Sequence, residues 1–472
     1  MGGHLGIQSF HIRVKGFLWR KWDALAHSAR GRAPDMPYHE RRYAAGVRHF
    51  EAGNLDRALN AFTDFLRLTH QSALVSADAP PYGLDGIRSY ADFDTAFGDL
   101  LDKKHLEWQR KRQPYPRFLA TLEAERPPRI DPAGKKILFL IPQYIMNSTR
   151  FIEADFKDLL LDSAANAGAQ VDAFYTDRCS YPDVNFDAQA AKAGLERLAE
   201  KTAAFAPDVI VLDGNYVPST ESLNPAFLGK EKSRHGFKLI AFVGDAWGSH
   251  WVPAADAWSE VCDIVFHCAP ETPFERECRF PEKLCWSGCP VNTRNFFRDE
   301  KKDFDISFVG TYVSGLRPFW LTVALQIAAK LNLKHRLLPH KREAGVALTM
   351  DQYAAVLRRS RMVLNFSTRL GPLKMMTGRT WQAMNAGTVL LEEDNAFTSA
   401  YFVPFVHFIP FATRNELAYA IEFFSRNPAE AARVGEAASA FCRERYSAKE
   451  VWSQLIGAAY AGTGLRDAAA QH

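Results

Sequence analysis

The stretch Lys135-Lys-Ile-Leu-Phe-Leu-Ile141 decides the fold, because it ends in five consecutive apolar residues. An unbroken apolar run is typical of a strand that is buried on both faces of a parallel sheet. Similar runs recur later in the chain, at residues 171–175, 209–212, 239–243 and 264–266. Helix-like stretches separate them, at residues 150–167, 188–205 and 253–261. Strands that alternate with helices predict a parallel sheet.

A second series of strands and helices follows a short joint at residues 291–302. Its strands are expected at residues 306–310, 361–366, 388–391 and 405–409. Its helices are expected at residues 316–331, 351–360, 379–386 and 428–445, and a last helix at 448–462. The pattern predicts an α/β protein in which two Rossmann-like doubly wound domains face each other across a cleft. Ligands of such sheets bind outside the carboxyl ends of the strands.

Four parts of the chain follow from this pattern. An α-helical N-terminal region is expected at residues 1–134, the first α/β domain at 135–290, the second at 291–447, and a C-terminal helix with a tail at 448–472. Within the first part, residues 43–65 have the small and aromatic residues of a single tetratricopeptide-like helix pair. One such unit is too few for a solenoid, so the pair is expected to pack on another part of the chain.

Composition and charge exclude several classes of protein. The chain has 472 residues, of which 47% are hydrophobic and 24% charged, as in an ordinary globular protein. A net charge of +4 is too small to argue for nucleic acid as a partner. No uncharged apolar run reaches the length of a membrane-spanning helix, and no signal peptide pattern is present. We therefore expect a cytoplasmic protein.

The N-terminus is basic, with eight Lys and Arg against three Asp and Glu in residues 1–42. Its bulky apolar side chains alternate with these cations. Residues 1–32 could therefore make a peripheral contact with an anionic membrane, which would place the protein at the inner face of the membrane. The alternative is a terminal helix docked on the body of the protein.

The seven cysteines are an odd number, which without a secretory signal indicates reduced thiols. Five of them lie between residues 262 and 289, where His267 also lies. No Cys-x-x-Cys pair is present, and Cys262 and Cys268 lie in the apolar run at residues 261–268. We therefore expect these two to be buried free cysteines in a strand rather than zinc ligands.

Several stretches carry a resemblance to a known family. In the second domain they are Asp305-Ile-Ser-Phe-Val-Gly-Thr311, Arg379-Thr-Trp-Gln-Ala-Met-Asn-Ala-Gly-Thr-Val-Leu-Leu391 and Phe441-Cys-Arg-Glu-Arg-Tyr-Ser447. In the first domain they are Leu239-Ile-Ala-Phe-Val-Gly-Asp-Ala-Trp247, Cys262-Asp-Ile-Val-Phe266 and Gly288-Cys-Pro-Val-Asn-Thr-Arg-Asn-Phe296. The chain thereby resembles the bacterial CgeB-like glycosyltransferases, which belong to group 1 of the two-Rossmann-domain, or GT-B, type.

This resemblance implies an enzyme that moves a hexosyl or related sugar from a nucleotide-sugar donor to a hydroxyl group on a glycan, lipid or protein. It implies no metal and no cofactor, since the nucleotide-sugar is itself the substrate. The second domain would hold the donor, the first domain would lie near the acceptor, and the last helix would cross back to the first domain. Without a metal, cations and backbone N–H groups must neutralise the charge of the departing nucleoside diphosphate.

The candidate donor-binding residues follow strands of the second domain, and arginine suits a diphosphate because its planar fork binds oxygens bidentately. They are Gly310, Thr311, Tyr312, Arg317, Lys374, Gly378, Arg379, Gln382 and Gly387. Many group 1 enzymes have glutamates at the places of Lys374 and Gln382, and the second of these grips the ribose hydroxyl groups. An uncharged amide binds a ribose diol less strongly, so the nucleotide and the competence of the site stay open.

The candidate catalytic residues are Asp245 and His250, which follow the apolar run at residues 239–243 and could accept the proton of the acceptor hydroxyl group. The alternative is that Asp245 caps a turn and His250 is merely exposed. Gln143, Asn147 and Arg150 follow the first strand and could contact the acceptor or a phosphate, although Asn147 could instead cap the next helix.

A metal site is not expected. Metal-dependent glycosyltransferases use Asp-x-Asp after a strand, whereas Asp92-Phe-Asp94 lies in the helical region and Asp303-Phe-Asp305 precedes its strand. Two alternatives to sugar transfer stay open: a nucleotide-sugar 2-epimerase, and a non-catalytic relative that binds sugar or protein.

Overall fold

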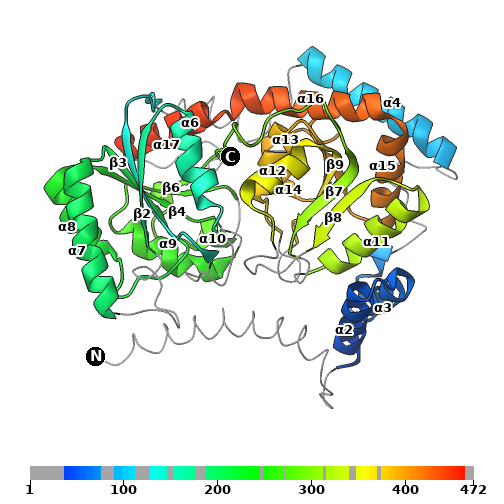
Figure 1. Ribbon diagram of the computed structural model, residues 1–472, viewed down its shortest axis with the longest axis horizontal. Coiled ribbons are helices and arrows are strands. Elements are labelled where there is room, and N and C mark those ends of the chain that lie inside the picture. Colours follow the sequence, from blue (N-terminus) through cyan, green and yellow to red (C-terminus); the bar gives the residue numbers. More distant parts are fainter. Residues whose placement is uncertain are drawn as a thin grey trace.

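The computed structural model describes residues 37–75, 90–111, 128–145, 153–176, 188–244, 246, 248–269, 273–311, 315–339, 347–368 and 374–462. Residues 1–36, which include the proposed membrane-contact segment 1–32, lie outside these ranges, as do four candidate site residues: Asn147, Arg150, Asp245 and Tyr312. Two α/β domains lie side by side, and the N-terminal helices pack on the outer side of the second (Figure 1).

The first domain is built on a six-stranded parallel sheet with the order β2-β1-β3-β4-β5-β6. Its strands are β1 (Lys136–Ile141), β2 (Gln170–Tyr175), β3 (Val209–Asp213), β4 (Lys238–Phe242), β5 (Ile264–His267) and β6 (Leu284–Trp286). Ile137 pairs with Val171 on one side and Val209 on the other, so the chain winds outward in both directions from β1. The five apolar runs thus form strands as expected. β6 was not expected, because three residues are too few to give a periodic signal.

Helices cover both faces of this sheet (Figure 1). They are the π-helix η5 (Lys157–Asp162), α6 (Ser163–Asn166), α7 (Ala188–Phe205), α8 (Pro225–His235), η6 (Ser249–Trp251), α9 (Val252–Ser259), α10 (Pro273–Glu277) and η7 (Pro281–Lys283). The expectation that Cys262 and Cys268 lie within a strand is wrong, because β5 starts at Ile264 and ends at His267. Both cysteines flank β5 and are free.

The second domain has a five-stranded parallel sheet with the order β11-β10-β9-β7-β8. Its strands are β7 (Phe304–Gly310), β8 (His335–Pro339), β9 (Ser360–Asn365), β10 (Val389–Glu393) and β11 (Ile409–Phe411). Its helices are α11 (Arg317–Lys330), α12 (Met350–Arg358), α13 (Gly378–Asn385), α14 (Ala396–Tyr401), α15 (Arg414–Arg426) and α16 (Pro428–Arg445). The expected α/β architecture of the GT-B type, with two doubly wound domains after a helical region, is confirmed.

Three details of the second domain differ from the expectation. The edge strand β8 contains His335 and Arg336, so it lacks the apolar run of a strand buried on both faces. The strand expected at residues 405–409 begins only at Ile409, because Phe405 has φ +62°, which a strand cannot accommodate. The helices α14 and α15 were not expected.

The last helix, α17 (Ala448–Ala461), leaves the second domain and packs against α6, β4 and β5 of the first. Nε1 of Trp452 donates a hydrogen bond of 2.9 Å to Oγ of Ser163. Nearby, the hydroxyl group of Tyr401 in the second domain donates a bond of 3.0 Å to the carbonyl oxygen of Ser287 in the first. Trp381 and Tyr446 pack on the ring of Tyr401. A buried aromatic cluster therefore joins the two domains.

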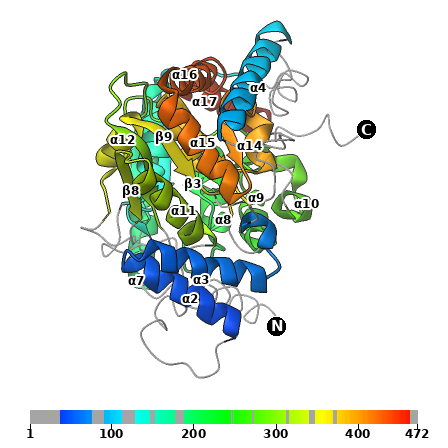
Figure 2. The same cartoon turned by 90° about the vertical axis from the view of Figure 1, so that its right-hand side faces the viewer.

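The N-terminal helices α2 (Tyr38–Glu51) and α3 (Leu55–Leu68) form a hairpin that packs on α11 (Figure 2). The hydroxyl group of Tyr43 donates a 3.0 Å bond to the carbonyl oxygen of Gly315. After the 3₁₀ turn η2 (Ser72–Val75), α4 (Tyr90–Lys111) packs on α15, where the rings of Phe97 and Phe423 meet edge to face. Within the described part of the chain, we find no helix whose length and apolar character would suit a membrane span.

Candidate functional site

The candidate site lies at the carboxyl ends of β7, β9 and β10, which are neighbours in the second sheet. Asn365 is the last residue of β9, Gly310 is the last residue of β7, and Glu392 is the next-to-last residue of β10. The helix α13 begins close to these strand ends, and its second residue is Arg379. Parallel strands present their carboxyl ends on one edge, so polar groups from three strands and one helix meet here.

Arg379 bridges two of these strands. Its Nη1 donates a 2.9 Å hydrogen bond to Oδ1 of Asn365, and its Nη2 donates to the carbonyl oxygen of Val309. Its guanidinium carbon lies 4.8 Å from the ring centroid of Phe308. The side chain is only partly buried. The guanidinium is therefore held in one plane by its two Nη groups, while its buried Nε has no partner among the described residues.

Gly310 makes this position of Arg379 possible. A Cβ atom added to Gly310 would lie 2.7 Å from Nη2 of Arg379, closer than a real Cβ contact. Any larger residue at this strand end would displace the guanidinium. The two residues were expected to act together at the donor, and the structure brings them into contact.

A buried polar network, formed by Asn365, Glu392 and two threonines, holds the Asn365 amide that Arg379 binds. Nδ2 of Asn365 donates to both carboxylate oxygens of Glu392, at 3.1 and 2.9 Å. Thr377 and Thr380 add hydroxyl bonds to the same groups. Glu392 is fully buried, and burial raises the pKa of its carboxyl group to about 7, although the bonds from Asn365 and Thr380 oppose this rise.

Tyr353 of α12 lies beside Arg379 and Gln382. Its hydroxyl group donates a 2.8 Å bond to Oε1 of Gln382, a residue that is 5% exposed. Burial raises the pKa of Tyr353; Arg379 lowers it, and Asp155 and Asp158 of the first domain raise it further. Charged groups of both domains thus act on Tyr353. Gln382 is joined to Arg379 through this tyrosine, which both residues contact.

The other expected donor residues lie at three places. Arg317 donates to the carbonyl oxygen of Thr311 at 2.9 Å and to its Oγ1 at 2.8 Å, just after β7. Lys374 donates to the carbonyl oxygen of Asp394, just after β10. Gly378 is the first residue of α13. These residues line the same sheet edge. Arg317 is bonded to the end of β7, and Lys374 is bonded to the end of β10.

Gly387 does not belong to this group. It precedes β10, so it lies at the amino end of the strand whose carboxyl end carries Glu392. Its φ is +64°, and the turn there packs so closely on α16 that an added Cβ at Gly435 would overlap the Gly387 carbonyl group. Gly387 therefore ends the α13 turn and packs against a helix, which is a structural role at the opposite edge of the sheet.

Two candidate residues of the first domain are described. His250 is exposed in the turn η6, where its ring packs 5.0 Å from that of Trp251. Gln143 follows β1, and its carbonyl oxygen accepts a bond from Ala154. Of the Asp-x-Asp pairs, Asp303 and Asp305 form ion pairs with Arg359 and Arg361.

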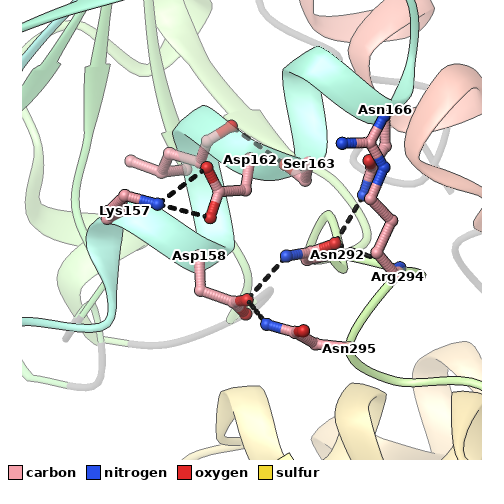
Figure 3. Close-up of polar contacts among 9 residues, drawn as sticks. Lys157, Asp158, Asp162, Ser163, Asn166, Asn292, Arg294 and Asn295 are labelled. Carbon is pink, nitrogen blue, oxygen red and sulfur yellow. Dashed lines mark hydrogen bonds and ion pairs between the residues drawn. The ribbon is translucent and has the colours of Figure 1, made fainter. Parts of the chain in front are cut away.

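A second buried carboxylate, Asp158 of η5, holds the joint between the domains (Figure 3). Its Oδ1 accepts hydrogen bonds from Nδ2 of Asn292 at 2.8 Å and from Nδ2 of Asn295 at 2.7 Å. Asn166 donates a further bond, at 2.5 Å, to Oδ1 of Asn292. Burial raises the pKa of Asp158 to about 6, although the two amide bonds oppose this rise.

The joint, residues 291–302, also contacts the second domain, through α12. The carbonyl oxygen of Asn295 accepts a bond from Nη1 of Arg358 in α12. The ring of Phe296 packs on Tyr353 with centroids 5.9 Å apart. The joint thus connects Asp158 of the first domain with Tyr353 at the donor edge of the second.

Four of these residues were missed by sequence reasoning: Tyr353, Asn365, Glu392 and Asp158. Two of them carried a usable signal. Asn365 interrupts the apolar run of β9, and Glu392 follows the three apolar residues at the start of β10, so both are polar side chains at the carboxyl ends of buried strands. Tyr353 and Asp158 lie in helices, where a single polar group gives no such signal.

Comparison with known proteins adds a family match. Residues 296–457 match the family described as "Glycosyl transferase-like". The match covers the second α/β domain and most of α17, and it includes Arg379, Asn365 and Glu392. The expectation of a glycosyltransferase is confirmed at the level of this enzyme class. The CgeB-like subtype and the tetratricopeptide-like nature of the hairpin stay predictions. No curated protein matches the chain.

Solved structures with a similar arrangement share little sequence. Anabaena Alr3699/HepE in complex with UDP and glucose is 13% identical over 70% of this chain and 100% of its own, with a TM-score of 0.45. Sucrose-phosphate synthase from Thermosynechococcus elongatus is 12% identical over 70% of this chain and 97% of its own, with a TM-score of 0.46. A glycosyltransferase from Rickettsia africae is 9% identical over 70% and 98%, with a TM-score of 0.43.

Proposed function

We propose that the chain transfers a sugar from a nucleotide-sugar donor to a hydroxyl group on a glycan, lipid or protein, without a metal. The observation that carries this proposal is the placement of Arg379. Its guanidinium is held between Asn365 and Val309 at the start of α13, next to the carboxyl ends of β7 and β9. A cation and the first N–H groups of a helix at this edge suit a diphosphate.

Charge develops on the diphosphate oxygens when the bond to the sugar breaks. A fixed guanidinium stabilises this charge more than a mobile one, since its position costs no reorganisation during the reaction. Arg379 is fixed by two hydrogen bonds and by the Phe308 ring. Arg317 and Lys374 add positive charge at the same sheet edge, and Gln382, which binds Tyr353, is proposed to contact the nucleoside.

The first domain would supply the acceptor side. Asp245 and His250 follow β4 and are proposed to take the proton of the acceptor hydroxyl group. Gln143, Asn147 and Arg150, which follow β1, are proposed to contact the acceptor. Residues 1–32 would hold the protein at the inner, cytoplasmic face of the membrane if the acceptor is a lipid.

Thermal shift with a panel of UDP-, GDP-, ADP- and CMP-sugars tests the donor. One nucleoside diphosphate sugar should raise the Tm, while the CMP-sugar, which has a single phosphate, should have less effect. Arg379→Lys should abolish most of this stabilisation, because an ammonium group cannot replace the planar fork. Arg361→Lys is the matched control, because Arg361 binds Asp305 in the same sheet but at the opposite edge.

The panel also separates the alternatives. A wild-type protein that responds to none of these nucleotides contradicts sugar transfer and favours a non-catalytic binding protein. A protein that binds a UDP-sugar and releases UDP without any acceptor would favour a 2-epimerase. The reaction of such an enzyme breaks the bond between the nucleotide and the sugar and needs no acceptor.

A further inference from the structure

We propose that Glu392 is a positioning residue that sets the orientation of the Arg379 guanidinium through the side-chain amide of Asn365. This inference rests on the proposed function, in which Arg379 binds the donor diphosphate. Glu392 itself would not touch the donor, since it is fully buried beneath Asn365 and Thr380.

The chemistry of the three groups permits only one arrangement. A guanidinium can only donate hydrogen bonds and an ionised carboxylate can only accept them, whereas an amide has one end of each kind. Asn365 lies between the two, with Oδ1 accepting from Arg379 at 2.9 Å and Nδ2 donating to Glu392 at 2.9 and 3.1 Å. As long as Glu392 is ionised, the amide cannot turn over, and its oxygen stays directed at Arg379.

The neighbouring hydroxyl and amide groups reinforce this order. Oγ1 of Thr377 lies within hydrogen-bond distance of both ends of the Asn365 amide, accepting from Nδ2 at 3.0 Å or donating to Oδ1 at 3.2 Å, so it serves the amide without competing for Glu392. Oγ1 of Thr380 donates to Oε2 of Glu392 at 3.1 Å, and Nδ2 of Asn395 donates to Oε1 at 3.3 Å. Both carboxylate oxygens therefore have donors from β9, α13 and the segment after β10. A fully bonded buried network holds its members more rigidly than an exposed pair would.

The charges around Glu392 are few. Arg379 of α13 lies on one side, and Glu393 is its neighbour in β10. Glu393 is directed to another partner, because its carboxylate accepts bonds from the backbone N and the hydroxyl group of Thr368. Burial, together with Glu393, raises the pKa of Glu392 to about 7, against the effect of Asn365, Thr380 and Arg379.

Protonation of Glu392 should therefore loosen Arg379. A neutral carboxyl group carries an O–H donor, which can bond to the amide oxygen of Asn365 and compete with Arg379 for it. The amide then has no fixed orientation. Donor affinity is expected to fall between pH 8 and pH 6, where the charge of a nucleotide-sugar does not change because it has no terminal phosphate group.

The test measures binding of the nucleotide-sugar that stabilises the wild type, by calorimetry at pH 8 and pH 6. At pH 8, Glu392→Gln should bind it about tenfold more weakly, as expected for the loss of one charge-assisted bond. Its affinity should not change further at pH 6, whereas that of the wild type should fall toward it. Glu393→Gln is the matched control, because the adjacent glutamate is also buried. This variant should bind like the wild type at pH 8, and the midpoint of its pH dependence should move to lower pH, because Glu393 raises the pKa of Glu392.

A second variant keeps the test decisive if Glu392→Gln folds poorly. Thr380→Val removes a hydrogen bond that favours the ionised carboxylate. The midpoint of the pH dependence of binding should therefore move to higher pH, which loss of packing alone would not cause. If Arg379→Lys loses the nucleotide-sugar while Glu392→Gln binds like the wild type at both pH values, the inference is overturned and the proposed function stands. If the wild type binds no nucleotide-sugar, both are overturned.

Discussion

The hydroxyl group of Tyr353 donates a 2.8 Å hydrogen bond to Oε1 of Gln382, and this bond connects α12 with α13. It also occupies one of the two acceptor sites of the Gln382 amide oxygen, and the amide nitrogen can only donate. A glutamate at this position would instead present a second acceptor, which is what a ribose diol requires.

Gln382→Glu should therefore strengthen nucleotide-sugar binding, by severalfold to about tenfold, because a charged acceptor bonds ribose hydroxyl groups more strongly than an amide does. Calorimetry with the stabilising nucleotide-sugar measures the change. Gln352→Glu is the control, since Gln352 forms the capping box of α12 and glutamate serves that box equally well. Weaker binding by Gln382→Glu would mean that the ligand uses the amide nitrogen as a donor.

Tyr353→Phe removes the hydroxyl group and leaves the buried Oε1 of Gln382 without this donor. The free energy of unfolding should fall by about 1–2 kcal/mol, and the nucleotide-sugar should bind more weakly. Chemical denaturation and calorimetry give the two values. Tyr419→Phe is the comparison, because its ring stacks 4.8 Å from that of Phe93, remote from Arg379, and stacking needs no hydroxyl group. Unchanged binding by Tyr353→Phe would show that Gln382 needs no partner.

The sheets were predictable because strands that are buried on both faces leave continuous apolar runs. That signal is strong for β1 and β9 and absent for the edge strand β8, which exposes His335 and Arg336. The late start of β11 was not predictable, because the strand propensity of residues 405–409 does not reveal that Phe405 has a positive φ. The location of most donor candidates at one sheet edge was likewise predictable, because parallel topology places all carboxyl ends together.

The contacts within the site were not predictable from spacing. Arg379 and Gly310 are 69 positions apart, and their contact depends on the order of β7, β9 and β10 in the sheet. The assignment of Gly387 to the donor edge followed a sequence pattern that does not distinguish a glycine at the start of a strand from one at its end. Tyr353 reaches the site only because α12 packs on α13.

Asp158→Asn should stabilise the protein at neutral pH. The pKa of Asp158 is raised in the folded state from 3.8 to about 6, so the folded protein binds more protons than the unfolded chain between these values. The carboxyl group therefore contributes stability below pH 4, and this contribution is lost as the pH rises through 6. Two pKa units correspond to about 3 kcal/mol, which is an upper estimate. Asparagine keeps the Oδ1 that Asn292 and Asn295 use and carries no charge.

The stability difference between Asp158→Asn and the wild type should thus move in favour of the variant from pH 4.5 to pH 7.5, as measured by urea unfolding. Asp162→Asn is the matched control on the same π-helix. Asp162 forms a partly exposed ion pair with Lys157, at 2.8 Å, so its loss should cost at most about 1 kcal/mol. A variant Asp158→Asn that is less stable than the wild type at pH 7.5 would mean that the two amides favour the charged carboxylate more than burial opposes it.

Gly457→Ala should destabilise the protein although alanine is the better helix former. Gly457 lies inside α17, where alanine alone would add up to about 1 kcal/mol of stability. A Cβ atom at this position would overlap the carbonyl oxygen of Pro128, in the segment that enters β1. That segment is bound to α17 by a 3.1 Å bond from the backbone N of Ile130 to the carbonyl oxygen of Ser453. This overlap forces either α17 or the segment before β1 to move, so the free energy of unfolding should fall by about 2 kcal/mol or more.

The comparison that isolates this contact is Gly229→Ala in α8, another glycine inside a helix of the first domain. An added Cβ at Gly229 would meet only Cγ2 of Val261, at 3.4 Å, which is an ordinary van der Waals distance. This variant should be neutral or more stable, by the helix propensity of alanine. If both substitutions stabilise the protein equally in urea unfolding, α17 does not hold the segment before β1, and the return of the chain to the first domain would depend on Trp452 and Ser163 instead.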